Sequence, residues 1–215
     1  MITLLPLLEG QHVRLEPLQR WHAQGLADAA AIDRAPYRWS PIPHGEAAAE
    51  AYVEAALALR DAGVAAPFVV LRVSDDVVIG STRFFDLGWW SWPAGHPRHG
   101  HDGPDVCEIG FTWLAKPAIG TAANTEMKLL MLTHAFEVFQ AQSVCFHTDA
   151  RNERSRAALE RIGAQFEGIL RAHRLATDDR PRDSARYSVT APEWPEVKHH
   201  LRMLLGARER AELKL

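Results

Sequence analysis

The segment Lys116–Asn124 (KPAIGTAAN) joins an expected strand to an expected helix, and small residues dominate it. Small side chains let a ligand approach the backbone, and the unpaired N–H groups at a helix start attract anions. The segment is therefore a candidate pyrophosphate site, although an ordinary turn capped by Asn124 or Thr125 explains it equally well. It has neither the Gly-Lys-Ser/Thr of a Walker A loop nor a dinucleotide fingerprint, which disfavours ATP and NAD.

A second turn, Asn152–Ser155, also follows an expected strand and opens an expected helix. Asn152 and Ser155 are small polar residues at capping distance, so they either cap the helix or reach into a cleft beside the preceding strand. Four arginines lie in or near this turn, at positions 151, 154, 156 and 161. A basic patch of that size suits a phosphorylated small molecule better than a nucleic acid duplex.

Hydrophobic periodicity and turn residues predict the elements that must position these two turns. Expected strands are 12–18, Phe68–Val73, Val77–Arg83, Val106–Leu114, Ser143–Thr148, Ala164–Glu167, Gly168–Leu175 and Ala185–Val189. Expected helices are Trp21–Ala31, Gly45–Ala62, Thr125–Phe139, Glu153–Ile162 and Trp194–Leu205. Strand hairpins combined with strand–helix–strand crossovers predict an α+β (α/β) fold with a mixed sheet.

Composition is that of one folded domain, with 215 residues, 47% apolar and 24% charged. The net charge of -3 gives no basic footprint for nucleic acid. No apolar run approaches the length of a membrane span, and the N-terminus lacks the features of a signal peptide, so no membrane contact and a cytoplasmic location are expected. Cys107 and Cys145 are expected to be free thiols, and no further Cys is available for a zinc site.

Several segments together resemble the GNAT superfamily, and more narrowly the RimJ/RimL-type ribosomal-protein-alanine N-acetyltransferases. They are GFTWL…IGTAANTE, HTDARNERSRAALERIGAQFEG, RDSARYSV and EWP, and the resemblance runs from about Leu8 to about Leu205. The family's pyrophosphate motif Q/R-x-x-G-x-G/A falls on Pro117–Ala122. Gly120 and Ala122 match it, whereas Pro117 departs at the first position.

The resemblance implies acetyl-CoA as co-substrate and a GNAT fold, with the cofactor arm between the strands Val106–Leu114 and Ser143–Thr148 as they splay apart. It implies four sets of cofactor-binding residues, in addition to Ser155. Backbone groups of Phe111, Thr112, Trp113 and Leu114 would bind the arm and the acetyl carbonyl. Ile119, Gly120, Thr121, Ala122, Ala123, Asn124 and Thr125 would hold the pyrophosphate, Asn152 the arm, and Arg161, Arg154 or Arg156 the 3′-phosphate.

The implied mechanism is direct transfer of the acetyl group to an amine. Many members carry a tyrosine acid on the helix after the second splayed strand, where this chain has Leu159; Ser155 matches the serine of RimL-like members and is the expected donor to the thiolate. Glu108 is the first choice for the base, with a structural ion pair as the alternative reading. Asp183, His147 and His173 are weaker candidates, and Arg174 stands where RimL-like enzymes have a catalytic Glu.

The segment Trp89–Asp105 is expected to be a long loop near the acceptor. Trp89, Trp90 and Trp92 are predicted to contact the acceptor, as pocket lining or as a peptide grip. His96, His99 and His101 resemble a metal-binding tract, but without fixed element geometry no metal is expected.

Three functions stay open on this reading: acetylation of a protein N-terminal or Lys amine, acetylation of a small-molecule amine such as an antibiotic or polyamine, and non-catalytic acyl-CoA binding. A loop closing the acceptor cleft would favour a small amine, and an open groove a protein. Residues 1–205 are expected to form the acetyltransferase domain, with 206–215 as a tail and a homodimer as one option.

Overall fold

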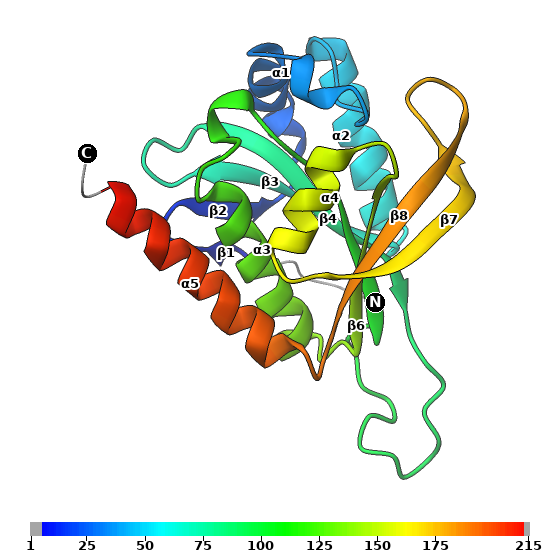
Figure 1. Ribbon diagram of the computed structural model, residues 1–215. Helices are drawn as coiled ribbons and strands as arrows, with labels where there is room; N and C mark the ends of the chain where they lie inside the picture. Colours follow the sequence, from blue (N-terminus) through cyan, green and yellow to red (C-terminus); the bar gives the residue numbers. More distant parts are fainter. Residues whose placement is uncertain (1–5, 213–215) are drawn as a thin grey trace.

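The chain folds around one mixed sheet, shown in the computed structural model of Figure 1. Residues 6–212 are described, and within them the strand order is β1-β2-β3-β4-β5-β6-β8-β7. The pair β5–β6 is parallel, and the other neighbouring pairs are antiparallel. The strands are β1 (Leu8–Glu9), β2 (Val13–Pro17), β3 (Ala65–Arg72), β4 (Val78–Gly88), β5 (Val106–Leu114), β6 (Ser143–Asp149), β7 (Gln165–Leu175) and β8 (Pro181–Thr190). The predicted α+β class with a mixed, mostly antiparallel sheet is confirmed.

Helices cover both faces of this sheet. They are α1 (Ala23–Ala31), α2 (Glu46–Asp61), α3 (Ala123–Thr133), α4 (Glu153–Arg161) and α5 (Trp194–Glu212). Along β3, Phe68 and Val70 pack into a core with α3, α4 and α5, whereas Val69 and Leu71 pack into a second core with α1 and α2. Because successive side chains of a strand point to opposite faces, the two cores lie on opposite sides of the sheet.

The parallel pair β5–β6 is joined over a short stretch only. Val106, Cys107 and Glu108 pair with Ser143, Val144 and Cys145, and no pairing follows toward the C-terminal ends of the two strands. The strands therefore splay beyond Glu108, as the family resemblance implies, and side chains from α3 and α4 line the space between them.

The carboxylate of Glu126 fixes the start of α3 to the N-terminal part of the chain. It accepts hydrogen bonds from the backbone N–H groups of Gln11, His12 and Val13 at 2.7–2.8 Å. Glu126 is buried, so these bonds satisfy an otherwise costly charge. Glu126 therefore holds the helix in place beside the sheet.

The structure differs from the sequence-based elements mainly at strand and helix ends. β7 is one strand where two were expected, because Gly168 lies at a shift in the pairing register with β8 and does not end the strand. The helix expected at Thr125–Phe139 is α3 followed by a π-helical turn at His134–Val138. α5 continues through residue 205, where the domain was expected to end, to Glu212. None of the helices in the described residues is long and apolar enough to span a bilayer.

Candidate active site

A cavity of about 730 Å³ lies where β5 and β6 splay apart. Most of the predicted cofactor residues line it: Phe111, Thr112, Trp113, Leu114, Ile119, Gly120, Thr121, Asn124, Asn152, Ser155 and Arg161. Glu108 lines it too, whereas Ala122, Ala123 and Thr125 are buried behind its wall. Residues from two distant parts of the sequence thus meet around one space.

A bulge in β5 marks the middle of the cavity wall. Arg83 of β4 pairs with Gly110 and Ser81 pairs with Trp113, so β5 holds one more residue than β4 between these two pairs. Phe111 carries the irregularity with a φ of 49°, a left-handed conformation that is uncommon for a bulky residue. Its ring lies under the Arg83 guanidinium at 4.0 Å. A bulge interrupts the ladder of backbone hydrogen bonds, which frees amide groups for a ligand.

The turn before α3 presents backbone amides to one end of the cavity. Thr121 Oγ1 accepts the N–H of Ala123 at 3.2 Å, so neither Asn124 nor Thr125 supplies the cap that the ordinary reading of this turn expects. Within the described residues, the amides of Gly120, Ala122 and Asn124 donate no backbone hydrogen bond outside regular elements. Gly120 has a φ of 81°, and a Cβ added there would meet nothing within 4 Å. This arrangement fits an anion at a helix start.

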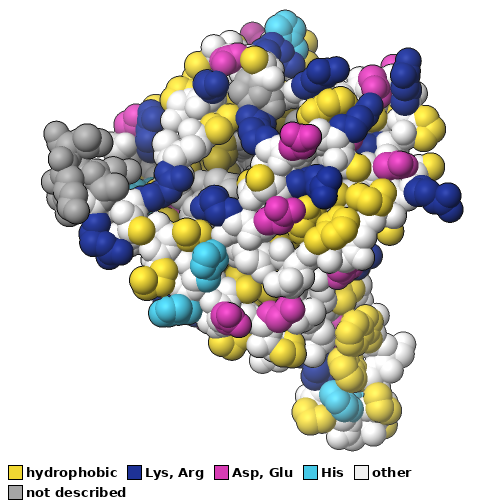
Figure 2. All heavy atoms as spheres, viewed as in Figure 1, with side chains coloured by type: hydrophobic (Ala, Val, Ile, Leu, Met, Phe, Trp, Pro, Cys, Tyr) yellow, Lys and Arg dark blue, Asp and Glu magenta, His cyan; other side chains and the backbone are white. Residues whose placement is uncertain are grey.

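Two arginines flank the same turn. Arg161 of α4 donates from Nη1 to Thr125 Oγ1 at 3.1 Å, and Arg208 of α5 donates to the Gly120 carbonyl. Burial lowers the pKa of Arg161, and the nearby Arg208 charge lowers it further. Figure 2 shows basic side chains gathered around α4 and the C-terminal end of α5. Two neighbouring cations beside free amides favour a phosphate-bearing ligand.

Arg208 was missed from the sequence because α5 was expected to end at Leu205. Residues 206–212 continue the helix in the structure and bring this arginine back to the cavity. The stretch ARERAE that follows Gly206 consists of good helix formers and was the signal for this continuation.

Asn152 and Ser155 open α4 at the other side of the cavity. Asn152 Oδ1 accepts the backbone N–H of Ser155 at 3.1 Å, so the reading of Asn152 as a helix cap is confirmed. Both residues also line the cavity. The bond uses the Ser155 backbone and leaves its Oγ out of the cap. Asn152 can therefore cap α4 and line the cavity at the same time.

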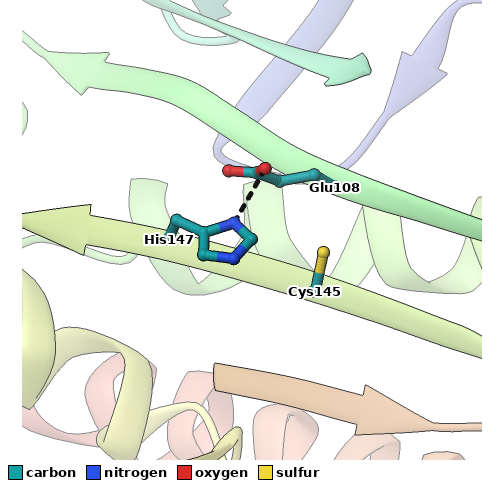
Figure 3. A group of neighbouring side chains, drawn as sticks. All are labelled: Glu108, Cys145 and His147. Atoms are coloured by element: carbon teal, nitrogen blue, oxygen red, sulfur yellow. Dashed lines mark ion pairs between the residues drawn. The ribbon is translucent and has the colours of Figure 1, made fainter. Parts of the chain in front are cut away.

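Glu108 is buried at the point where the two strands part (Figure 3). Its Oε2 lies 2.8 Å from His147 Nδ1 and 2.7 Å from Arg174 Nη2. The His147 contact is an ion pair without the angles of a directed hydrogen bond, and Nε2 of the same ring is buried without a partner among the described residues. Burial acts to raise the pKa of Glu108, but His147 and Arg174 outweigh it and hold this pKa below its usual value.

Cys145 lies beside this pair, and ligand atoms of Glu108, Cys145 and His147 are within 4.8 Å of one another. The guanidinium of Arg174 is already bound to the Glu108 carboxylate, and burial raises the pKa of Cys145 to about 12. Glu108, His147 and Arg174 therefore form a cluster of acidic and basic groups, with Cys145 beside it. Of the weaker base candidates, His173 has its ring 4.7 Å from the His147 ring, and Asp183 accepts the Ala172 N–H at 2.8 Å.

Lys128 is a cavity residue that sequence reasoning missed. It is 4% exposed, and its Nζ donates to Thr112 Oγ1 at 3.1 Å. Burial lowers its pKa to about 7. The helical spacing contains a signal for it, because Lys128 lies three and four residues before Met131 and Leu132, both fully buried.

The opposite end of the cavity is lined by the α1–α2 connection and the β7–β8 hairpin. Tyr37, Trp39 and Ser40 come from the first, and Arg174, Leu175, Ala176, Thr177 and Arg182 from the second. Thr177 Oγ1 donates to the Arg38 carbonyl at 3.0 Å, and Arg151 lies 4.2 Å over the Trp39 ring. The two segments therefore touch and partly enclose this end.

The predicted acceptor contacts Trp89, Trp90 and Trp92 do not lie at this cavity. Their loop projects from the ends of β4 and β5 that lie away from the splay (Figure 1). Trp90 N and Trp92 Nε1 both donate to the buried Asp105 carboxylate, at 2.7 and 2.8 Å. The Trp90 backbone and the Trp92 indole are therefore anchored to Asp105 within the loop. The sequence-based expectation placed the loop by its neighbouring strand, without the strand's direction, and contact of these tryptophans with an acceptor stays a prediction.

Comparisons with known proteins agree on the family. Residues 12–165 match the model of the acetyltransferase (GNAT) domain. The "Putative ribosomal N-acetyltransferase YdaF" of Bacillus subtilis (strain 168) is 36% identical over 91 residues, which are 42% of this chain and 49% of that protein. The chain thus spans about half the length of this curated relative.

Solved structures extend the similarity over nearly the whole chain. A GCN5-related N-acetyltransferase from Brucella melitensis has a TM-score of 0.79 and 27% identity, over 93% of this chain and 85% of that one. A "putative acetyltransferase" from T. thermophilus has a TM-score of 0.76 and 36% identity, over 95% of this chain and 100% of that one. The fold and the family rest on these matches.

Proposed function

The chain belongs to the GNAT acetyltransferase family, and on that premise we propose that it transfers the acetyl group of acetyl-CoA directly to a primary amine. The observation that carries the proposal is the cavity at the β5–β6 splay. It combines free amides at a helix start, two flanking arginines and a strand bulge in one continuous space. The free amides and the arginines fit the phosphates of a phosphorylated acyl-thioester, and the strand bulge fits its carbonyl group.

Residues of the cavity divide between binding and chemistry. The 119–125 turn with Arg161 and Arg208 holds the phosphates, and Asn152 faces the arm. Acetyl-CoA supplies the activated thioester. Backbone groups at the Phe111 bulge receive the thioester oxygen, where they can stabilise negative charge without reorganising.

Proton transfer is assigned to the cluster at the start of the splay. Glu108, ionised and held by His147 and Arg174, accepts a proton from the attacking amine together with His147. Ser155 donates a hydrogen bond toward the leaving sulfur. The lowered pKa of Glu108 keeps it ionised, so protonation of Glu108 itself is expected to reduce activity only below the ordinary glutamate pKa of 4.5.

The acceptor that we propose first is a protein N-terminal amine. It is supported by the ribosomal N-acetyltransferase name of the curated relative. A small-molecule amine is the second candidate, supported by the Thr177–Arg38 contact, which partly encloses the acceptor end. The two candidate acceptors differ in size but would occupy the same end of the cavity.

A thiol-release assay with acetyl-CoA tests the proposal. Wild type is given peptides with free N-termini and, separately, small amines such as polyamines and aminoglycosides, with Glu108→Gln as the matched variant. Release that requires an amine and falls by about 100-fold in Glu108→Gln is expected. Tight CoA binding without release for any amine would contradict the enzyme proposal. Release with small amines alone would transfer the assignment to the second candidate.

A further inference from the structure

We propose that Lys128 is a catalytic residue, whose ammonium group meets the sulfur that leaves during acetyl transfer and gives it a proton. This inference rests on the proposed function. It adds a charged group to the wall that otherwise offers the sulfur the neutral hydroxyl of Ser155.

Lys128 lies in the wall of the cavity at the splay. Its Nζ lies 3.1 Å from Thr112 Oγ1 on β5 and 5.2 Å from the Phe146 ring on β6. The side chain of an α3 residue therefore spans the gap between the two splayed strands. Thr112 belongs to the stretch proposed to bind the arm and carbonyl, so the amine lies beside the proposed path of the thioester.

Lys128 is buried, and no carboxylate among the described residues pairs with it directly. Among the described residues Lys128 forms no ion pair, and Thr112 is its hydrogen-bond partner. Thr112 is in turn bonded to Thr82 at 2.8 Å. The carboxylate that acts on Lys128 is Glu108, through space, and Glu108 is already bound by His147 and Arg174. A buried lysine without a paired carboxylate costs stability.

The acidity of the Lys128 ammonium suits the protonation of a leaving thiolate. A group that titrates close to the working pH is an efficient acid, and burial lowers the pKa of Lys128 to about 7. An ordinary thiol has a pKa of about 8.5, and a thiolate beside Lys128 stabilises the ammonium in turn, so the two groups can share the proton on nearly equal terms. Serine is a much weaker acid and is suited to orienting the sulfur.

The nitrogen of the acceptor forms a bond to the acetyl carbon, the carbon–sulfur bond breaks, and sulfur keeps the electron pair. Lys128 transfers one proton from Nζ to that sulfur. The proton lost by the acceptor amine goes to the Glu108–His147 pair, and solvent restores the proton on Lys128 after the thiol has left. The net products are the acetylated amine and the free thiol.

The decisive test is the titration of CoA bound to the protein, followed by thiolate absorbance between pH 6 and 9. The protein's own buried thiols do not interfere, because burial raises the pKa of Cys107 and that of Cys145, the latter to about 12. A cation within a few ångströms lowers a thiol pKa by about 1–3 units. We expect CoA bound to wild type to form thiolate at least about one pH unit lower than free CoA.

Lys128→Met is the test variant, since methionine has a similar length and matches the apolar neighbours. Lys198→Met is the control, because Lys198 lies on α5 in an ion pair with Glu137 outside the cavity. In Lys128→Met the thiol shift should vanish and turnover should fall about 100-fold, with CoA still bound. Lys198→Met should behave as wild type.

Two outcomes would overturn the role of Lys128. One is an unshifted thiol in wild type, which needs no variant and holds even if Lys128→Met fails to fold. The other is the same shift in Lys128→Met as in wild type. Failure of wild type to bind CoA at all is a different result, because it would contradict the proposed function itself.

Discussion

Glu108 and Lys128 are both buried ionisable residues of the cavity wall, but their surroundings differ. Glu108 is paired by His147 and Arg174, which outweigh its burial and lower its pKa. Lys128 has no such pair among the described residues, and burial lowers its pKa toward the neutral range. At the scale of single residues, the site therefore holds a stable anion beside an amine that can lose its proton at working pH.

This difference predicts a pH-dependent stability effect for Lys128→Met. The pKa of Lys128 falls from 10.5 in the unfolded chain to about 7 in the folded one. Below pH 7 the charged lysine carries its full cost of burial; from pH 7 to 10.5 the unfolded chain holds the extra proton, so wild type gains stability as the pH rises. Lys128→Met should be more stable than wild type by roughly 1–4 kcal/mol at about pH 6.

Denaturant unfolding at several pH values measures this effect. The advantage of Lys128→Met should shrink steadily as the pH rises toward the ordinary lysine pKa. A variant that is less stable than wild type in mild acid would show that the lysine is a structural residue.

Ser155→Ala tests the neutral donor separately. The cap of α4 uses the Ser155 backbone N–H and the Asn152 side chain, so alanine leaves the helix start intact. Turnover should fall about 10–100-fold, with CoA affinity nearly kept, when both are measured by thiol release and calorimetry. An unchanged rate would remove Ser155 from the mechanism.

At the scale of elements, the phosphate site proposed at the Lys116–Asn124 turn can be tested with two variants of matched shape. Gly120 needs a left-handed φ, which Asn and Asp tolerate better than other side chains, and space beside it is open. Gly120→Asp and Gly120→Asn therefore have nearly the same shape and differ in charge. Calorimetry should show CoA affinity at least about tenfold weaker for Asp than for Asn. Equal affinities would contradict a phosphate at this turn.

The elements around the site were largely predictable, and the contacts between them were not. The β5 and β6 strands, the 116–124 turn and the α4 start were visible as apolar runs followed by small or polar residues. The Thr177–Arg38 contact was not visible, because it joins residues 139 positions apart through a hairpin and an irregular connection. The location of Trp89–Trp92 relative to the cavity was not visible either, because no local pattern fixes the direction in which a loop projects.

At the scale of the whole molecule, charge is unevenly distributed. The net charge is -3, yet basic side chains gather around α4 and the C-terminal end of α5 (Figure 2). α5 closes this region only because it continues past residue 205. The C-terminal end of α5 is therefore coupled to the ligand site at the start of α3.

Arg208→Ala tests that coupling, with Arg210→Ala as the control on the same helix. Arg208 lines the cavity, whereas Arg210 is exposed and lies outside its lining. Loss of one charge-assisted hydrogen bond should weaken CoA binding about 10-fold or more in Arg208→Ala. Arg210→Ala should bind as wild type, and equal weakening in both variants would indicate a general charge effect.

The central claim is that the splay between β5 and β6 holds acetyl-CoA with its thioester beside Glu108 and Lys128. A crystal structure of the CoA complex measures this most directly. The account predicts the pyrophosphate on the amides of 120–124, between Arg161 and Arg208, and the sulfur within hydrogen-bonding reach of Ser155 Oγ and Lys128 Nζ. CoA bound outside the splay, or a sulfur remote from both groups, would contradict it.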